Sequence, residues 1–217
     1  AVSSRSLFQL EEANTLFESH GQEAYDSYME DTADLPLEPG PAFPLVSKLL
    51  ALNSSRLPER PDRVEVVLLS RNSAAAGLRV MNSVHAHGLD IEGAVFTHGG
   101  DRFAYASALG ADLFLCTNPE DARRALANGV AAASILPMPS GIHGKSPQAS
   151  CDGIVRIAFD GDSVLFSDEA DKLFIEHGLA RFREEELRRA QNPLGDGPFK
   201  RFLVKLHELR CSLPKEL

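Results

Sequence analysis

Short runs of apolar, often β-branched residues recur along the chain and alternate with longer amphipathic stretches. This alternation is typical of parallel strands joined by crossover helices, which cover both faces of the sheet. The five runs are VEVVLLS (64–70), GAVFTHG (93–99), ADLFLC (111–116), AAASIL (131–136) and IVRIAF (154–159). We therefore expect an α/β fold with a parallel sheet and strands at these five positions.

The clearest helix signal is NPEDARRALANG, residues 118–129. Asn118 can cap the first turn, and Pro119 suits the first helical position. The two acidic residues that follow complement the helix dipole, and Gly129 can end the helix. The pattern predicts a helix that begins next to Asn118 and ends before Gly129.

Composition and charge limit the possible partners and location. With 217 residues and 43% hydrophobic content, the chain can fill the core of a large α/β domain. A formal net charge of −9 argues against a nucleic acid polymer as partner. We see no leader peptide and no membrane span, and three cysteines without metal-type spacing (Cys116, Cys151, Cys211) indicate reduced, structural thiols. These features favour a cytoplasmic protein and leave a homo-oligomer possible.

Part of the chain recurs at a constant distance along the sequence. EEANTLFESHG (11–21) matches DEADKLFIEHG (168–178), and GPAFPLVSKLLAL (40–52) matches GPFKRFLVKLHEL (197–209), so both pairs share an offset of 157 positions. The Pro-, Gly- and Ser-rich stretch between the copies is typical of a linker. We expect a first unit at 1–140, a linker at 141–153 and the start of a second unit at 154–217.

The two copies differ at one triplet. AVSSRSLF (1–8) aligns with AFDGDSVLF (158–166) after a one-residue gap. Ser3, Ser4 and Arg5 therefore stand where the second copy has Asp160, Gly161 and Asp162. One copy keeps two acids and the other has lost them.

Two carboxylates at the end of an apolar run have a chemical explanation. They supply oxygen ligands of the kind that Mg²⁺ prefers, together with a neighbouring backbone carbonyl. Asp160 can then attack phosphorus in line to give an aspartyl-phosphate, while Asp162 protonates the leaving oxygen and later deprotonates water. The alternative is a solvated strand end without chemistry.

Other ligand sites fit the sequence less well. A calcium loop that began at Asp160 would need a polar fifth residue and a sixth-position Gly, where the chain has Val164 and Leu165. No P-loop is present. His85 and His87 lie two positions apart on an expected helix and so point to different faces, which argues against a metal site there.

The acid motif IAFDGDSVLFSDEA (157–170) resembles the first motif of haloacid dehalogenase-like phosphatases. With SSRSLF, PGPAFPLV, VVLLSRNS and GPFKRFLVKLHEL, nearly the whole chain resembles the cytosolic type I 5′-nucleotidase family. The resemblance implies a Rossmann-like parallel sheet of the haloacid dehalogenase type, with internal duplication and a helical cap insertion. It also implies magnesium-dependent hydrolysis of nucleoside 5′-monophosphates, AMP above all, with Asp160 as nucleophile and Asp162 as acid/base.

The first unit departs from the pattern that this resemblance implies. Such phosphatases also use a Ser or Thr at the end of a second strand, a Lys, and a further acidic pair. Ser70 stands where that hydroxyl is expected, or it is simply a polar residue in a turn. The segment THGGDRFAYASALG (97–110) contains no Lys, and Cys116 and Thr117 stand where the two acids are expected. The first unit is therefore interpreted as a degenerate copy, in which Arg5 either holds an anion without metal or is an ordinary surface residue.

The second unit reaches Leu217 before a second-motif strand of its own. Either residues 151–217 begin a second Rossmann-like domain, or the run 154–159 joins the first sheet and brings Asp160 near Ser70. Residues 168–196 are charged and helix-prone, which favours a cap over the site or a solvated hairpin. An apolar stripe on the last helix indicates core packing: Phe199, Phe202, Leu203, Leu206 and Leu209.

The function that we expect is magnesium-dependent hydrolysis of AMP-like nucleotides at Asp160 and Asp162. Ser70 and Arg5 are weaker candidates for substrate binding. A catalytically silent nucleotide-binding or regulatory module, or a phosphatase for another small phosphomonoester such as a sugar phosphate, stays open as an alternative.

Overall fold

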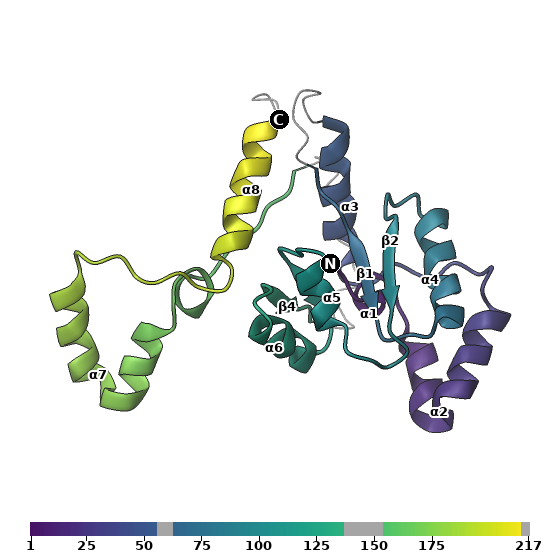
Figure 1. Ribbon diagram of the computed structural model, residues 1–217, viewed down its shortest axis with the longest axis horizontal. Helices are drawn as coiled ribbons and strands as arrows, with labels where there is room; N and C mark the ends of the chain where they lie inside the picture. The colour runs from purple at the N-terminus through teal and green to yellow at the C-terminus, as the bar shows by residue number, and fades with distance from the viewer. Residues whose placement is uncertain (56–62, 137–153, 214–217) are drawn as a thin grey trace, which may run out of the picture.

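The computed structural model describes residues 1–55, 63–136 and 154–213 as a mixed α/β structure (Figure 1). Its strands are β1 (Val67–Ser70), β2 (Gly93–Phe96), β3 (Phe114–Cys116) and β4 (Ala132–Ser134). The longer helices are α2 (Glu11–Asp31), α3 (Phe43–Ala51), α4 (Ala74–Ala86), α6 (Pro119–Ala127), α7 (Glu169–Arg189) and α8 (Lys200–Ser212). The short elements are α1 (Ser4–Leu7), η1 (Leu52–Ser55), α5 (Phe103–Ala108) and the turn η2 (Gly161–Leu165).

All the strands run parallel, and Val2 joins them into one arrangement. β1 pairs with β2, and β3 pairs with β4. Val2 lies between the two pairs, with parallel bridges to Leu68 and Leu115. Its backbone N–H donates to Val67 O at 2.9 Å, and the next N–H, of Ser3, donates to Leu115 O at 2.9 Å. The order in space is therefore β2, β1, Val2, β3, β4, and the carboxyl ends of all strands meet at one edge.

The sheet is apolar on both faces, because successive residues of a strand point to opposite sides. Leu68 packs in a core with residues of α2, α3 and α4, whereas Leu69 packs with Phe103 of α5 and Ala122 of α6. Both leucines are fully buried. The predicted parallel sheet with helices on both faces is confirmed, and four of the five predicted strands form.

Helix α6 confirms the prediction for residues 118–129. The backbone N–H of Glu120 donates to Asn118 Oδ1 at 2.9 Å, so the expected cap is made. Gly129 follows the helix with a φ of 75°, a left-handed conformation that glycine adopts without strain. Local signals alone specify both ends of this helix.

The prediction of a fifth strand is wrong. Residues 154–159 form no strand, and Ile154 and Ile157 are 46% and 37% exposed. In the first copy of the repeat, Val2 already fills the place between β1 and β3. A strand needs backbone pairing with a neighbouring strand, and the described residues pair none with this run, whose counterpart Val2 takes the central place in the first sheet. The arrangement in which this run joins the first sheet is therefore not the one found.

Both copies of the repeat adopt the same local backbone structure. The N–H of Gly40 donates to Leu7 O at 2.8 Å, and in the second copy the N–H of Gly197 donates to Leu165 O at 2.9 Å. Helices α2 and α7 each span 21 residues. Figure 1 shows both of them bent into a hairpin.

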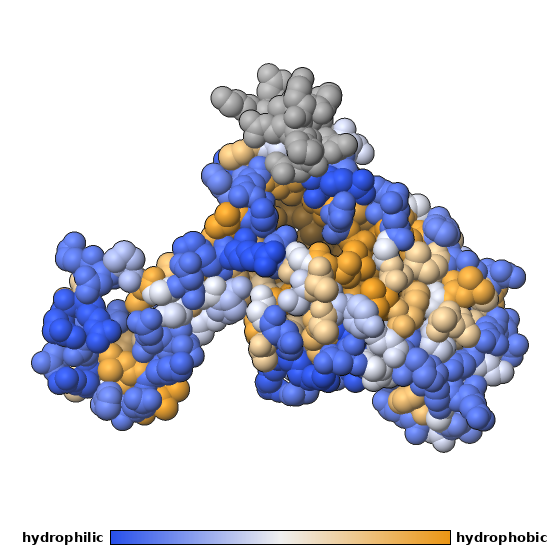
Figure 2. All heavy atoms as spheres, in the orientation of Figure 1, coloured by the Kyte–Doolittle hydropathy of each residue, from blue (hydrophilic) through white to orange (hydrophobic). Residues whose placement is uncertain are grey.

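Helix α8 lies against the first unit, whereas α7 lies away from the sheet (Figure 1). Arg201 Nε is 3.0 Å from Asp112 Oδ1, and Phe202 is buried. The other four residues of the predicted stripe are half-buried. On α7, four large apolar side chains are exposed: Phe174, Ile175, Leu179 and Leu187. Figure 2 shows orange atoms on this hairpin.

The predicted linker at 141–153 and Cys151 lie outside the described residues. Cys116 is buried and Cys211 exposed, and both are free thiols, as expected. Among the residues that the structure describes, no helix combines the length and apolar character needed to cross a membrane.

Candidate functional site

The two predicted catalytic acids lie in the turn η2, just before α7. Asp160 and Asp162 are both exposed, one residue apart. Asp160 caps the turn, because its Oδ1 accepts a hydrogen bond from the Gly161 N–H at 2.7 Å. Ser163 has a φ of 59°, and its hydroxyl donates to the Asp171 carboxylate, which ties the turn to α7.

The two acids belong to no larger metal-binding cluster among the described residues. No group of three or more His, Cys, Asp or Glu side chains in the described ranges is arranged to hold a metal ion. Ser70 lies instead at the end of β1, in the first unit. The structure therefore does not bring Asp160 and Ser70 into one composite pocket.

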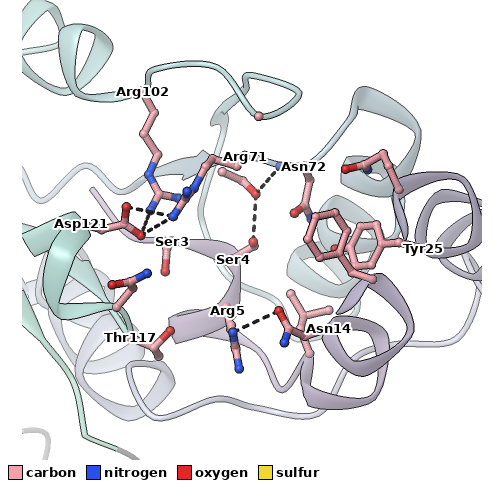
Figure 3. Close-up of a pocket in the computed structure, with 16 residues that line it drawn as sticks. Ser3, Ser4, Arg5, Asn14, Tyr25, Arg71, Asn72, Arg102, Thr117 and Asp121 are labelled. Carbon is pink, nitrogen blue, oxygen red and sulfur yellow. Dashed lines mark hydrogen bonds and ion pairs between the residues drawn. The ribbon is translucent and has the colours of Figure 1, made fainter. Parts of the chain in front are cut away.

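A pocket of about 380 Å³ lies at the carboxyl edge of the first unit's sheet (Figure 3). Ser3, Ser4 and Arg5 follow Val2, and Ser70 ends β1. The carboxyl ends of parallel strands are the usual place for a ligand in an open α/β sheet, and here they bring these side chains together. The pocket thus belongs to the copy of the repeat that lacks the acids.

Ser70 and the triplet that replaces the acids are in direct contact. Ser4 Oγ and Ser70 Oγ are 2.9 Å apart, and both side chains are buried. Ser70 Oγ also accepts a hydrogen bond from the Asn72 N–H at 3.1 Å. Ser70 thus lies at the end of β1, beside the triplet that stands in place of the acids.

Arg5, the predicted anion ligand, also lines this pocket (Figure 3). Its side chain is exposed, and Nη1 donates to Asn14 Oδ1 of α2 at 3.1 Å. Within the described residues, no carboxylate forms an ion pair with Arg5. Its guanidinium charge therefore has no anionic partner in this part of the chain.

Two more arginines share one buried carboxylate at the opposite side of the pocket. Arg71 Nη2 contacts Asp121 Oδ1 at 2.9 Å and Oδ2 at 2.8 Å, and Arg102 Nη2 contacts Oδ2 at 2.5 Å. The Arg102 and Asp121 side chains are each 6% exposed, whereas Arg71 is 46% exposed. Burial lowers the pKa of Arg102, and the nearby Asp121 charge opposes this shift. Arg102 Nε is buried without a hydrogen-bond partner among the described residues.

The sequence patterns did not predict this cluster of three residues. They indicate a role for Asp121 only at the helix dipole, and none for Arg71 or Arg102. One signal was present: Asp121 shares a helical face with Ala122 and Ala125, which are both buried. A carboxylate on a buried apolar face requires a charged or hydrogen-bonding partner, and this requirement could have pointed to an arginine.

Helix α2 supplies an aromatic wall to the pocket. The rings of Phe17 and Tyr25 lie edge to face, with centroids 6.1 Å apart and an angle of 85°. Burial raises the pKa of Tyr25 to about 12. The second copy repeats this pair on α7, where Phe174 and Phe182 have centroids 6.1 Å apart at 81°. Both copies therefore place an aromatic pair on the helical hairpin that follows the triplet.

Comparisons with known proteins agree on the family. The family model of 5′-nucleotidases matches residues 1–217. Human cytosolic 5′-nucleotidase 1B is 35% identical over 213 residues, which are 97% of this chain and 34% of that protein. The chain thus spans about a third of the length of this relative. No solved structure matches the chain. The whole-length family match and the level of identity show that the chain belongs to the 5′-nucleotidase family.

Proposed function

We propose that this chain contributes to a phosphatase that converts nucleoside 5′-monophosphates, such as AMP, into nucleoside and phosphate. The observation that carries the proposal is the family match, which includes the Asp160–Asp162 triplet. The name of the human relative, cytosolic 5′-nucleotidase 1B, supports the substrate class and a cytosolic location. A small nucleotide is the partner that follows.

In this proposal, Asp160 is the nucleophile. Its Oδ1 is held by the Gly161 N–H, which orients an exposed carboxylate for attack on phosphorus. Attack forms the bond from the Asp160 carboxylate to phosphorus and breaks the bond from phosphorus to the nucleoside 5′ oxygen. The first products are an aspartyl-phosphate and the free nucleoside.

Asp162 is the proposed acid/base. It donates a proton to the departing 5′ oxygen, so that a neutral hydroxyl leaves. It then takes a proton from a water molecule that attacks phosphorus, which releases phosphate and restores Asp160. Two acids one residue apart can divide these roles because one bonds to phosphorus while the other moves the proton.

A magnesium ion fits the donor set of this turn. Mg²⁺ takes few oxygen ligands from a protein while it keeps several waters and binds substrate phosphate, and the exposed Asp160 carboxylate is one such ligand. Asp160 would hold the ion through its carboxylate and Asp162 through its backbone carbonyl, which leaves the Asp162 carboxyl free to move the proton, and the ion would neutralise phosphoryl charge during transfer.

The hairpin of α7 is proposed as the cap over this turn. In the first copy, the matching hairpin α2 lines the pocket with Phe17 and Tyr25. The corresponding rings of α7 are Phe174 and Phe182, and the turn and helix are joined through Ser163 and Asp171. By this correspondence, α7 would contact the nucleoside while the acids contact the phosphate.

Phosphate release from AMP in the presence of Mg²⁺ tests the proposal. The unaltered chain is compared with Asp160→Asn, Asp162→Asn and Glu186→Gln, in which an exposed carboxylate of α7 is neutralised as a control. We expect the first two variants to lose turnover and the third to keep it. Turnover that survives Asp160→Asn would remove this nucleophile from the mechanism.

A second candidate is a nucleotide-binding module without catalysis. It is favoured by the exposure of both acids, which belong to no cluster of three or more possible metal ligands among the described residues. Binding of AMP without turnover by the unaltered chain would support this module. Faster turnover of a sugar phosphate than of AMP would instead favour a phosphatase for another phosphomonoester.

A further inference from the structure

The pocket of the first unit has an excess of positive charge. Three guanidinium groups line it, those of Arg5, Arg71 and Arg102, together with the single carboxylate of Asp121. That carboxylate accepts hydrogen bonds from both Arg71 and Arg102. Among the described residues, the third cation, Arg5, donates a hydrogen bond to the neutral amide of Asn14 and forms no ion pair. The pocket is therefore suited to a ligand that brings negative charge.

A divalent cation does not fit this pocket. The two positions that carry acids in the second copy are Ser3 and Arg5 here, so one ligand is neutral and the other positive. Asp121 is already shared by two arginines at 2.5 to 2.9 Å. A metal ion would have to displace these bonds and lie near three cations, which Coulomb repulsion opposes.

The available donors match a phosphate group. Arg5 is exposed, and Arg71 is half-exposed, so both can turn N–H groups toward an anion in the pocket. Ser3 and Ser4 lie at the same edge of the sheet (Figure 3), and Ser70 also lines the pocket; their buried hydroxyls bond to other serines, Ser4 to Ser70 and Ser3 to Ser6, and would reorient to reach an anion. Guanidinium and hydroxyl groups together bind phosphate oxygens through charge-assisted hydrogen bonds.

Three apolar or aromatic side chains lie on the α2 side of the pocket, together with the amides of Asn14 and Gln22. Leu10, Phe17 and Tyr25 line it, and the volume of about 380 Å³ lies in the range of small-molecule sites. A ligand that fills the pocket therefore needs an anionic end and a flat apolar end. A nucleotide has both, with its phosphate for the arginines and its base for the rings.

We propose that the first unit binds a nucleotide without a divalent cation, in the Ser3–Arg5 pocket and separately from Asp160. This site goes beyond the proposed hydrolysis, because it lies in the copy of the repeat that lacks the acids. The identity of the apolar part as a nucleoside rests in part on the proposed function, since the same aromatic pair occurs on α7. The loss of the acids has thus converted a metal-dependent phosphate site into an arginine-dependent one.

Equilibrium dialysis of labelled AMP in the presence of EDTA tests this site. We expect AMP to bind the unaltered chain and Asp160→Asn equally well. Arg5→Ala should weaken binding by about tenfold, because a charge-assisted hydrogen bond is lost. Arg5→Glu should weaken it by more, because the new carboxylate also repels the phosphate. Arg123→Ala is the matched control, because Arg123 is an exposed arginine of α6 that pairs with Glu120 and does not line the pocket.

A second comparison separates a nucleotide from free phosphate. Phe17→Ala should weaken AMP binding several-fold and leave competition by inorganic phosphate unchanged, and Phe17 is exposed enough for this truncation to be tolerated. Competition by inorganic phosphate alone, with no effect of Phe17→Ala, would overturn the assignment to a nucleotide. Binding that requires Mg²⁺, is lost in Asp160→Asn or persists in Arg5→Glu would overturn the site itself. Turnover of AMP with Mg²⁺ in the same variants reports separately on the proposed hydrolysis.

Discussion

Gly21 and Gly178 occupy the same position in the two copies of the repeat and share one backbone conformation. Their φ and ψ angles are 83° and −172° for Gly21, and 74° and 175° for Gly178. Each residue interrupts a helix and turns it into a hairpin. This combination of positive φ and extended ψ is essentially restricted to glycine, so the same residue sets the bend in both copies.

Replacement of Gly21 by Ala should destabilise the protein. A side chain at this backbone conformation costs about 1–3 kcal/mol, and α2 packs against α4 and buries Ala13, Tyr25 and Met29. Gly178→Ala should lower the stability of the whole protein less, because α7 buries only Ala170 and Glu185. Urea unfolding followed by circular dichroism measures both free energies.

Glu23→Ala is the control for these variants, because Glu23 is an exposed residue of α2. It should change the free energy of unfolding by less than about 0.5 kcal/mol. Equal losses for Gly21→Ala and Gly178→Ala would contradict the inference that only the first hairpin is packed into the core.

Gly40 is required for a close backbone approach rather than for an unusual φ. A Cβ atom on Gly40 would lie 2.8–2.9 Å from backbone atoms of Ser6, Leu7 and Phe8, which cannot move as a flexible side chain would. Gly40→Ala should therefore cost about 1–3 kcal/mol of stability, as overpacking does. Thermal unfolding checks this, with the exposed neighbour Glu38→Ala as control. An unchanged midpoint in Gly40→Ala would show that the backbone of residues 6–8 can yield.

The elements with local signals were predictable from the sequence. Helix α6 has its cap, its proline and its final glycine, and these alone specify its ends. The run 154–159 has the same apolar character as the strands that form, yet it is not a strand. Whether such a run forms a strand depends on where the tertiary structure places it relative to other strands, which a short run cannot encode.

The candidate site was predictable only in part, for a related reason. The repeat aligns Ser3–Arg5 with the acid triplet, but the contact between Ser4 and Ser70 was not predicted. Asp121 lies 50 positions from Arg71 along the chain, and the pair forms only when the strand ends converge. Long-range ion pairs of this kind leave little trace in the local sequence.

Asp121→Asn should be strongly destabilising. The change leaves the Arg102 guanidinium, which is 6% exposed, without its counter-charge, and breaking a buried ion pair in this way costs about 3–5 kcal/mol. Glu120→Gln, one residue away, removes only an exposed pair with Arg123 and should cost less than about 1 kcal/mol. Guanidinium chloride unfolding compares the two. Similar small losses would mean that Arg102 is adequately solvated without Asp121.

The hydroxyl of Tyr25 should make stability depend on pH in the alkaline range. Burial raises its pKa from 10.0 to about 12, so between these values the unfolded chain has lost a proton that the folded chain keeps. The free energy of unfolding contributed by this group is therefore fully present below pH 10 and falls as the pH rises toward 12. A shift of two pKa units corresponds to a loss of about 3 kcal/mol.

Comparison with Tyr25→Phe isolates this contribution from other groups that titrate at alkaline pH. Because removal of the hydroxyl also changes stability at neutral pH, the slopes of stability against pH are compared rather than the absolute values. We expect a shallower fall above pH 10 in the variant. The absorbance of tyrosinate gives a second measurement, because the variant should lack the ionisation near pH 12 that the unaltered chain shows. Equal slopes in the two proteins would mean that the phenol is exposed to solvent, and the aromatic wall of the pocket would then be more open than the packing of Phe17 on Tyr25 implies.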